Sequence, residues 1–180
     1  MADNILTIFN EEHVTEEEGK HYRLRRAVRI VVFDSNNKIA LLYIEYKGQE
    51  GSYILPGGGV HKDETFDQAA IRECSEELGC EIEITQILGT IMEYWKEELL
   101  KIENIGYIGK IVGEKNPIVL VGDEDEAEKK GTIVWVTPEE ALTLVESNKI
   151  PEKLYVKYVL RKSLNFLQKV IEINNFYCRE

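Results

Sequence analysis

The sequence predicts a mixed α/β (α+β) fold, in which strands precede, separate and follow helices. The chain has 180 residues, which is the size of one domain, and 43% of them are hydrophobic, as a globular core requires. Its apolar runs alternate between short β-branched segments and longer segments with helical spacing. We therefore expect a single domain over residues 1–180, with an N-terminal extension of about residues 1–22 and a C-terminal helix of about residues 152–173.

The expected strands are short runs of β-branched and aromatic residues bounded by Gly, Pro, Asn or Asp. The first run predicts an edge strand, and the turn Asp34-Ser35-Asn36-Asn37 joins the second and third runs into a hairpin. The fourth run ends at Pro56-Gly57-Gly58-Gly59, where glycine permits close approaches of the backbone. In order, the expected strands cover residues 5–9, 27–33, 39–46, 53–55, 81–94, 102–112, 118–121 and 132–136.

The helix expected at residues 66–78 has the clearest boundaries. Thr65 and Gln68 form a capping box before it, and Gly79 stands where a left-handed C-terminal cap belongs. A second capping box, Thr137-Pro138-Glu139-Glu140, opens a short helix. The last helix carries an apolar face that suits either the core or a homodimer interface. Its residues are Leu160, Leu164, Leu167 and Ile171.

Acidic residues outnumber basic ones, 33 Asp and Glu against 22 Lys and Arg, and the formal charge is -11. Such a surface disfavours long nucleic acid as a partner, because nucleic-acid binding needs cations that neutralise phosphates. It remains compatible with a small phosphorylated ligand that a divalent cation bridges to carboxylates.

The chain has no apolar run long enough to span a membrane and no secretory signal at its start. We therefore expect a cytoplasmic protein with no membrane partner. Cys74, Cys80 and Cys178 are an odd number without paired spacing, which suits reduced thiols. Cys74 and Cys80 are expected to be small buried side chains rather than nucleophiles.

Three carboxylates crowd one face of the helix expected at residues 66–78. Glu73, Glu76 and Glu77 fall within an arc of about 100°, and Arg72 is the only cation in the same two turns. This pattern is typical of a solvated acidic face, but a bound Mg²⁺ or Mn²⁺ would also relieve the repulsion. The preceding glycine turn favours the metal hypothesis, because backbone groups at a helix N-terminus bind phosphate oxygens.

These residues resemble the Nudix box. Gly58, Glu64 and the segment Arg72-Glu73-Cys74-Ser75-Glu76-Glu77-Leu78-Gly79-Cys80 match every fixed position of that motif with its spacing. A weaker resemblance extends over about residues 25–145. The resemblance implies a Nudix-type α/β/α sandwich with a mixed central sheet, to which this sequence adds the long C-terminal helix. It also implies hydrolysis of a diphosphate linkage in a nucleoside diphosphate derivative or nucleoside triphosphate, by water attack on phosphorus with Mg²⁺ or Mn²⁺ as cofactor.

The resemblance implies roles for individual residues. Arg72 matches the residue that orients the glutamates by ion pairing, and Glu64 matches an acidic position that supports the metal site. Relatives often add a loop glutamate as metal ligand or general base; Glu126 and Glu128 are the candidates, although simple solvation also explains them. The positions that match metal ligands are Glu73, Glu77, Glu76 and the carbonyl of Gly57.

Residues outside the box give less information about the substrate. Arg25 and Arg29 share one face of a strand and either hold a distal phosphate or pair with the acidic segment at residues 11–18. Tyr94 and Trp95 either stack a nucleobase or pack within the protein. Gly58 and Gly59 are expected to bind phosphate through their backbone. The downstream proline associated with enzymes that act on ADP-ribose is missing at its usual offset.

Two hypotheses of different classes follow. The first is a Nudix hydrolase, a pyrophosphohydrolase that acts on a small nucleotide. The second is a module that keeps the Nudix fold and senses a nucleotide or binds a partner without hydrolysis. The complete set of box carboxylates favours the enzyme.

Overall fold

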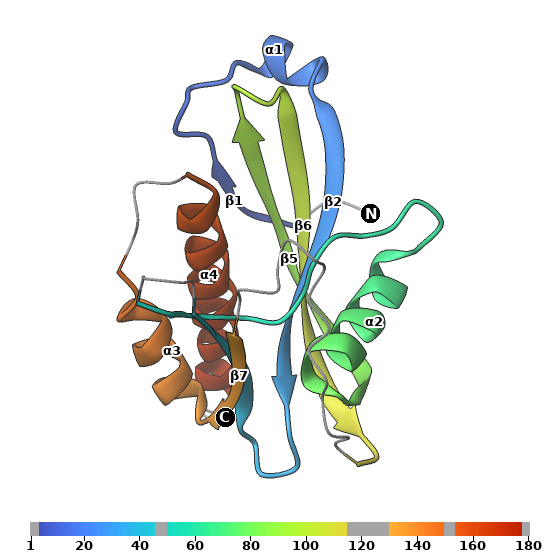
Figure 1. Cartoon of the computed structure of the whole chain (residues 1–180), viewed down its shortest axis with the longest axis vertical. Helices are drawn as coiled ribbons and strands as arrows, with labels where there is room; N and C mark the ends of the chain where they lie inside the picture. The colour runs from blue at the N-terminus through green and yellow to red at the C-terminus, as the bar shows by residue number, and fades with distance from the viewer. Residues whose placement is uncertain (1–3, 46–49, 115–129, 150–153, 178–180) are drawn as a thin grey trace.

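The computed structural model describes residues 4–45, 50–114, 130–149 and 154–177. They form a seven-stranded sheet with helices on both of its faces (Figure 1). The strands are β1 (Ile5–Phe9), β2 (Arg23–Phe33), β3 (Ile39–Glu45), β4 (Ser52–Ile54), β5 (Glu81–Trp95), β6 (Leu100–Val112) and β7 (Lys130–Val136). The helices are α1 (Glu16–Lys20), α2 (Phe66–Leu78), α3 (Pro138–Glu146) and α4 (Leu154–Tyr177).

The sheet is mixed, and its strand order is β1-β5-β6-β2-β3-β4, with β7 paired to β3. The β1–β5 and β2–β6 pairs are parallel, and the other pairs are antiparallel. β2 runs beside β6 from Arg23 to Phe33, whereas it pairs with β3 only where Phe33 faces Ile39. The sheet therefore opens between β2 and β3 along most of β2.

The loop at residues 56–60 fills part of this opening through its backbone. The amide of Val28 donates to the carbonyl of Gly58 at 2.9 Å. The amide of Ile30 donates to the carbonyl of Pro56 at 3.0 Å. These bonds attach the glycine turn to the edge of β2, and the same loop leads into α2.

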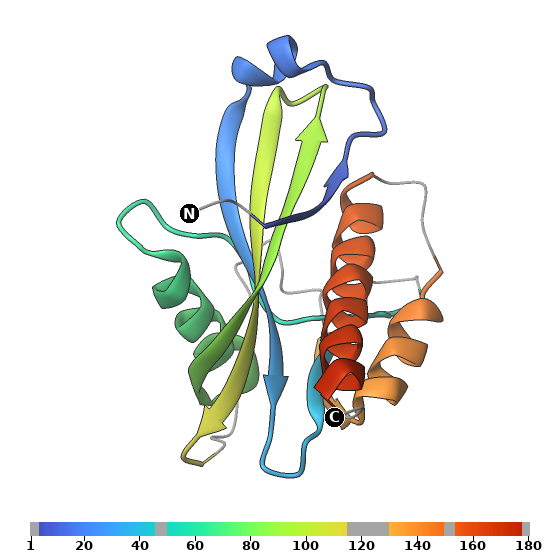
Figure 2. The same cartoon turned by 180° about the vertical axis from the view of Figure 1, so that it is seen from behind.

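Helix α2 covers one face of the sheet, and α3 and α4 cover the other, as the opposite views in Figures 1 and 2 show. Two clusters of buried side chains fill the two layers, and residues of β2 alternate between them because side chains of a strand point to opposite faces. The cluster under α2 includes Val28, Ile30, Val32, Ala70 and Cys74. The cluster under α4 includes Ala27, Val31, Phe33, Phe166 and Leu167. Odd-numbered residues of β2 therefore face α4.

The predicted α/β/α sandwich, mixed sheet and long C-terminal helix are confirmed. Helix α2 begins after Thr65 and ends at Gly79, whose φ of 64° is left-handed, and α3 begins after the capping box at Thr137. On the predicted apolar face of α4, Leu160 and Leu167 are buried. The chain's own core thus covers these residues without a second copy.

The N-terminal part differs from the expectation. β2 begins at Arg23 and not at Ala27, because the arginine-rich residues before Ala27 pair with β6. The extension contains the short helix α1, which was not predicted although Thr15 and Glu18 form a capping box before it. The strand expected at residues 118–121 lies outside the described residues.

Two other expectations concern the cysteines and the membrane. Cys74 and Cys80 are buried, as predicted, while Cys178 lies outside the described residues. Within the described ranges, no helix combines the length and apolar character that crossing a membrane requires.

Candidate active site

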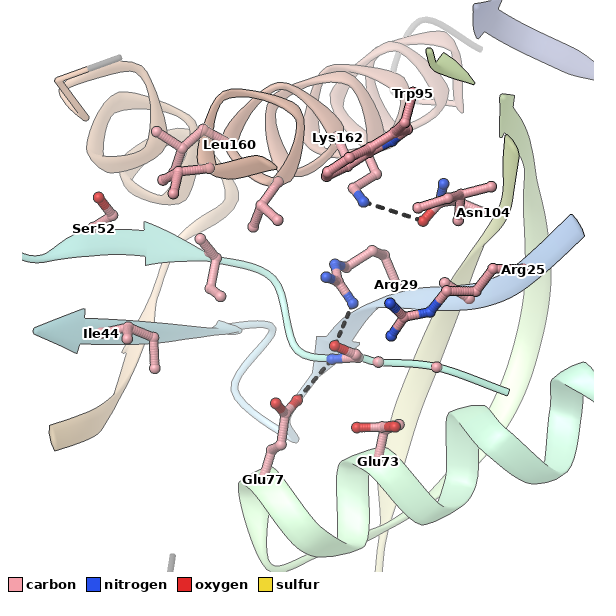
Figure 3. Close-up of a pocket in the computed structure, with 18 residues that line it drawn as sticks. Arg25, Arg29, Ile44, Ser52, Glu73, Glu77, Trp95, Asn104, Leu160 and Lys162 are labelled. Atoms are coloured by element: carbon pink, nitrogen blue, oxygen red, sulfur yellow. Dashed lines mark hydrogen bonds between the residues drawn. The ribbon is translucent and has the colours of Figure 1, made fainter. Parts of the chain in front are cut away.

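A pocket of about 270 Å³ lies beside the opening between β2 and β3 (Figure 3). Helix α2 and the glycine loop line one side of the pocket, α4 lines the other, and β2 lies between them (Figure 3). The pocket brings together many of the residues that the sequence singled out. They are Arg25, Arg29, Gly57, Gly58, Gly59, Glu73, Glu77 and Trp95.

Glu73 and Glu77 lie one turn apart on α2 and both line the pocket. Oε2 of Glu77 accepts a hydrogen bond from the amide of Gly57 at 2.7 Å. The carboxyl group of Glu73 packs on Gly58, where a Cβ atom would lie only 2.7 Å from its Cδ. Burial raises the pKa of both carboxyls, and that of Glu77 reaches about 7. Two carboxyls held in a site that disfavours their charge create a place where a cation binds favourably.

Arg72 connects the glutamates of the box to the loop. Its Nε and Nη2 bind the two oxygens of Glu64 at 2.8 and 3.0 Å. Its Nη1 donates to Glu73 and to Glu76, both at 2.9 Å, and Nη2 also donates to the carbonyl of Gly59. The guanidinium lowers the pKa of Glu64 to about 2. Arg72 thereby fixes the position of α2 relative to the loop.

Arg25 and Arg29 form the cationic part of the pocket. Both lie on the α4 face of β2, as the alternation along the strand predicts. Nη1 of buried Arg29 donates to the carbonyls of Val28, at 2.9 Å, and Gly57. Arg25 is exposed and lies over Gly59. The glycine loop lies between these two arginines and the carboxyls of Glu73 and Glu77 (Figure 3).

The acidic segment at residues 11–18 was the alternative partner for these two arginines, but in the described part of the chain its glutamates pair with other cations. Glu11 pairs with Lys157 and Arg161 of α4. Glu18 pairs with Lys96 after β5. The segment thus ties the N-terminal extension to the main body of the protein.

The α4 side of the pocket contains a polar group that the sequence analysis did not single out. Lys162 of α4 pairs with Glu93 of β5 at 2.6 Å, and its Nζ also donates to Oδ1 of Asn104 at 3.2 Å. Glu93 is fully buried. A signal was present in the sequence, because Glu93 lies two residues from both Ile91 and Trp95 on β5 and therefore shares their buried face.

Several predicted site residues lie elsewhere. Tyr94 does not line the pocket, because adjacent residues of a strand point to opposite faces and Trp95 points into the pocket. The ring of Tyr94 packs on Gly19 and lies 6.5 Å from the ring of Tyr22. Trp95 lines the pocket with a buried ring, and its Nε1 donates to Glu93 at 3.1 Å. Glu64 and Glu76 do not line the pocket but bind Arg72, and Glu126 and Glu128 lie outside the described residues.

The donor chemistry fits a hard divalent cation. Glu73 and Glu77 supply carboxylate oxygens beside the backbone of Gly57 on one side of the pocket. In the described part of the chain, no three carboxylate, imidazole or thiol groups already converge as a metal site. This is compatible with Mg²⁺, which commonly binds through one or two carboxylates, waters and the phosphates of a substrate rather than in an all-protein cage.

Comparisons with known proteins agree with this geometry. A curated relative, the ADP-ribose pyrophosphatase of Methanocaldococcus jannaschii, is 26% identical over 108 residues, which cover 58% of this chain. The aligned part spans 64% of that relative's length.

Solved structures share the fold at low identity. The MutT protein of Methanosarcina mazei Go1 matches with a TM-score of 0.54 and 18% identity over 85% of this chain and 96% of its own. A Nudix hydrolase from Nitrosomonas europaea matches with a TM-score of 0.55 and 16% identity over 78% of this chain and 90% of its own. Residues 23–157, more than half of the chain, match the model of the NUDIX domain. The chain therefore belongs to the Nudix family.

Proposed function

We propose that the chain is a pyrophosphohydrolase that cleaves a diphosphate linkage in a small nucleoside diphosphate derivative or nucleoside triphosphate, with Mg²⁺ or Mn²⁺ as cofactor. One observation carries the proposal. One pocket is lined both by the carboxyls of buried Glu73 and half-buried Glu77 and by the guanidinium groups of Arg25 and Arg29, with the glycine loop between the two pairs. A diphosphate and its cation need both kinds of group, because the cation binds carboxylates and the phosphoryl oxygens bind guanidinium.

The residues of the pocket have different proposed roles. Glu73 and Glu77, with the carbonyl of Gly57, would hold the cation. When bound there, a divalent cation would supply charge neutralisation on the phosphoryl oxygens and a lowered pKa of the attacking water. Arg25 and Arg29 bind phosphoryl oxygens and orient the diphosphate for in-line attack.

The remaining residues of the box support these groups. Arg72 keeps Glu73 in place, and Glu64 keeps Arg72 in place, through the bonds described above. Glu76 is exposed and pairs with Arg72, from which it can turn toward the cation as a supporting ligand. Glu126 and Glu128 stay candidates for the general base.

ADP-ribose is the first substrate to test, because the curated relative is named an ADP-ribose pyrophosphatase. The missing downstream proline argues for a wider panel that also includes nucleoside triphosphates, dinucleoside polyphosphates and sugar nucleotides. We also propose that the protein works in the cytoplasm on a small molecule, without nucleic acid or membrane as partner.

The experiment is hydrolysis of this panel by the full chain with Mg²⁺ or Mn²⁺, followed by the same assay after chelation with EDTA. The Glu77→Gln variant removes one predicted ligand with little change in shape, and we expect it to lose at least about 100-fold in kcat/KM, as loss of a group acting on the transition state does. Glu83→Gln is the matched control, because Glu83 is exposed on β5 outside the pocket. Binding without release of any product from the panel would instead support the sensing module, and equal activity of Glu77→Gln and wild type would refute the assignment of the site.

A further inference from the structure

The α4 side of the pocket holds a buried network centred on Glu93. Oε1 of Glu93 binds Nζ of Lys162 at 2.6 Å and accepts from Nδ2 of Asn104 at 2.8 Å. Oε2 accepts from Nε1 of Trp95 at 3.1 Å. Lys162 is only 5% exposed, and Asn104 and Glu93 are fully buried. The network therefore fixes Lys162, Asn104 and Trp95 along the pocket.

Two residues that line the pocket, Arg29 and Lys162, each keep an N–H group without an acceptor among the described residues. The ammonium group of Lys162 has three N–H bonds, and its contacts among the described residues are with Glu93 and Asn104. Nε of Arg29 is buried, and it has no hydrogen-bond partner among the described residues. Both side chains line the same pocket, and Figure 3 shows the nitrogen of Lys162 directed toward the guanidinium of Arg29. A buried donor without a partner is unfavourable until a ligand supplies an acceptor.

The charges favour an anionic acceptor. Arg25, Arg29 and Lys162 line the same pocket, and burial lowers the pKa of Lys162, as do the positive charges of Arg29 and Arg25. Glu93 is the only carboxylate in contact with Lys162 among the described residues. A neutral carbonyl would satisfy one donor, whereas a phosphoryl group would satisfy several donors and also relieve the repulsion.

We propose that Lys162 and Nε of Arg29 form a donor pair that binds a phosphoryl oxygen of the substrate on the side of the pocket away from the Nudix box. The C-terminal helix is then part of the substrate site, and Lys162 is a specificity-determining residue that favours substrates with phosphoryl oxygens in this position. This inference rests on the proposed function, because it assigns a further contact to the same substrate.

Lys162→Met alone is a poor test, because it leaves the buried carboxylate of Glu93 without its cation and destabilises the fold. The better comparison is Glu93→Gln against the double variant Glu93→Gln/Lys162→Met. Both variants lack the charge at position 93 and keep an oxygen there as acceptor, so they differ only in the lysine. Lys169→Met is the matched control, because Lys169 lies on the same helix, pairs with an exposed glutamate, Glu172, and does not line the pocket.

The primary measurement is binding of inorganic pyrophosphate to the full chain at pH 7 with Mg²⁺, by calorimetry, with adenosine as a ligand that lacks phosphate. Glu93→Gln should bind pyrophosphate at least as tightly as wild type, because the neutral amide oxygen of glutamine competes for Lys162 less strongly than the carboxylate does. The double variant should bind pyrophosphate about 10- to 150-fold more weakly than Glu93→Gln, the range of one hydrogen bond to a charged group. Adenosine binding and the Lys169→Met variant should be unchanged. Thermal unfolding of each variant confirms that the compared proteins are folded.

Three outcomes would overturn the proposal: equal pyrophosphate affinity of the single and double variants, a parallel loss of affinity in both, or a loss confined to adenosine. Failure of the proposed hydrolysis is a separate result. It would appear as pyrophosphate binding without turnover of any nucleotide in the wild type, and the comparison of binding constants would still decide the role of Lys162.

Discussion

Replacement of Gly58 by alanine should disable the site without unfolding the protein. The φ angle of Gly58 lies outside the left-handed region, so alanine can adopt this backbone conformation. The new Cβ atom, however, would lie 2.7 Å from both Cδ and Oε2 of Glu73, and closer still to Oε1. Ordinary van der Waals contacts begin at about 3.4 Å, so the carboxyl group must move by at least about 0.7 Å.

A displacement of this size is large for a carboxyl group that would hold the cation beside the reacting phosphate. Misplacement by about 1 Å costs on the order of 100-fold in rate, which corresponds to about 2.7 kcal/mol of transition-state stabilisation. We therefore expect Gly58→Ala to lose roughly 100-fold in kcat/KM on the best substrate of the panel. Its free energy of unfolding should change by less than about 1 kcal/mol, because Glu73 borders an open pocket into which it can move.

The neighbouring glycines provide the controls. At Gly59 the nearest atom to a Cβ is Nη2 of Arg25 at 3.3 Å, the end of an exposed flexible side chain, so Gly59→Ala should change kcat/KM by no more than about twofold. At Gly57 the φ of +130° and a contact of 3.0 Å with the backbone of Arg29 oppose any side chain, so Gly57→Ala should lower stability itself.

Steady-state kinetics and urea unfolding of the three variants test these expected changes in activity and stability. Wild-type activity of Gly58→Ala would refute the predicted displacement of Glu73. Equal losses in Gly58→Ala and Gly59→Ala would refute it too, because the loss would then come from the loop backbone and not from Glu73.

Three further predictions concern stability. Arg72 lowers the pKa of Glu64 from 4.5 to about 2, so this carboxylate stabilises the fold above pH 4.5 and its contribution disappears as the pH falls toward 2. Glu64→Gln should therefore be less stable than wild type at pH 7 by about 1 kcal/mol after allowance for solvent screening. Urea unfolding should show this difference in stability shrink below pH 4.5; a difference that persists there would contradict the prediction. Gly106→Ala should cost about 1–3 kcal/mol in urea unfolding, since its Cβ would lie 2.8 Å from Cζ of the fully buried Phe166; a stability equal to wild type would show that α4 can shift away from β6. Thr65→Ala removes the side-chain cap of α2 and should cost about 1 kcal/mol, while Thr65→Ser, which keeps the hydroxyl, should cost much less.

Local signals predicted the elements that have their own start and stop residues. The cap at Thr65, the repeat of apolar residues and Gly79 defined α2 to within one residue, because each signal acts on the helix itself. The same kind of cap at Thr15 and Glu18 stands before α1, but the helix is so short that it lacks an apolar repeat. The start of β2 depended on its partner β6, which no local pattern reveals.

The site was predictable where the family motif and the alternation of a strand apply. Alternation placed Arg25 and Arg29 on one face, and the motif identified the glutamates of α2. Lys162 was not predictable in this way, because its burial depends on where α4 packs on the sheet. Its partner Glu93 is separated from it by 69 residues in sequence, 162 minus 93, and only the tertiary fold brings the two together.

The attachment of the glycine loop to β2 gives the protein an internal reporter of loop motion. The amides of Val28 and Ile30 lie within a strand, yet their hydrogen-bond acceptors are carbonyls of the loop, at Gly58 and Pro56. Exchange of these two amide hydrogens with deuterium therefore requires the loop to leave β2. The amides of β2 that bond to β6 exchange only when the sheet itself opens. A ligand that holds the loop in place should slow the exchange at Val28 and Ile30 selectively, so binding can be followed residue by residue even with a molecule that is never hydrolysed.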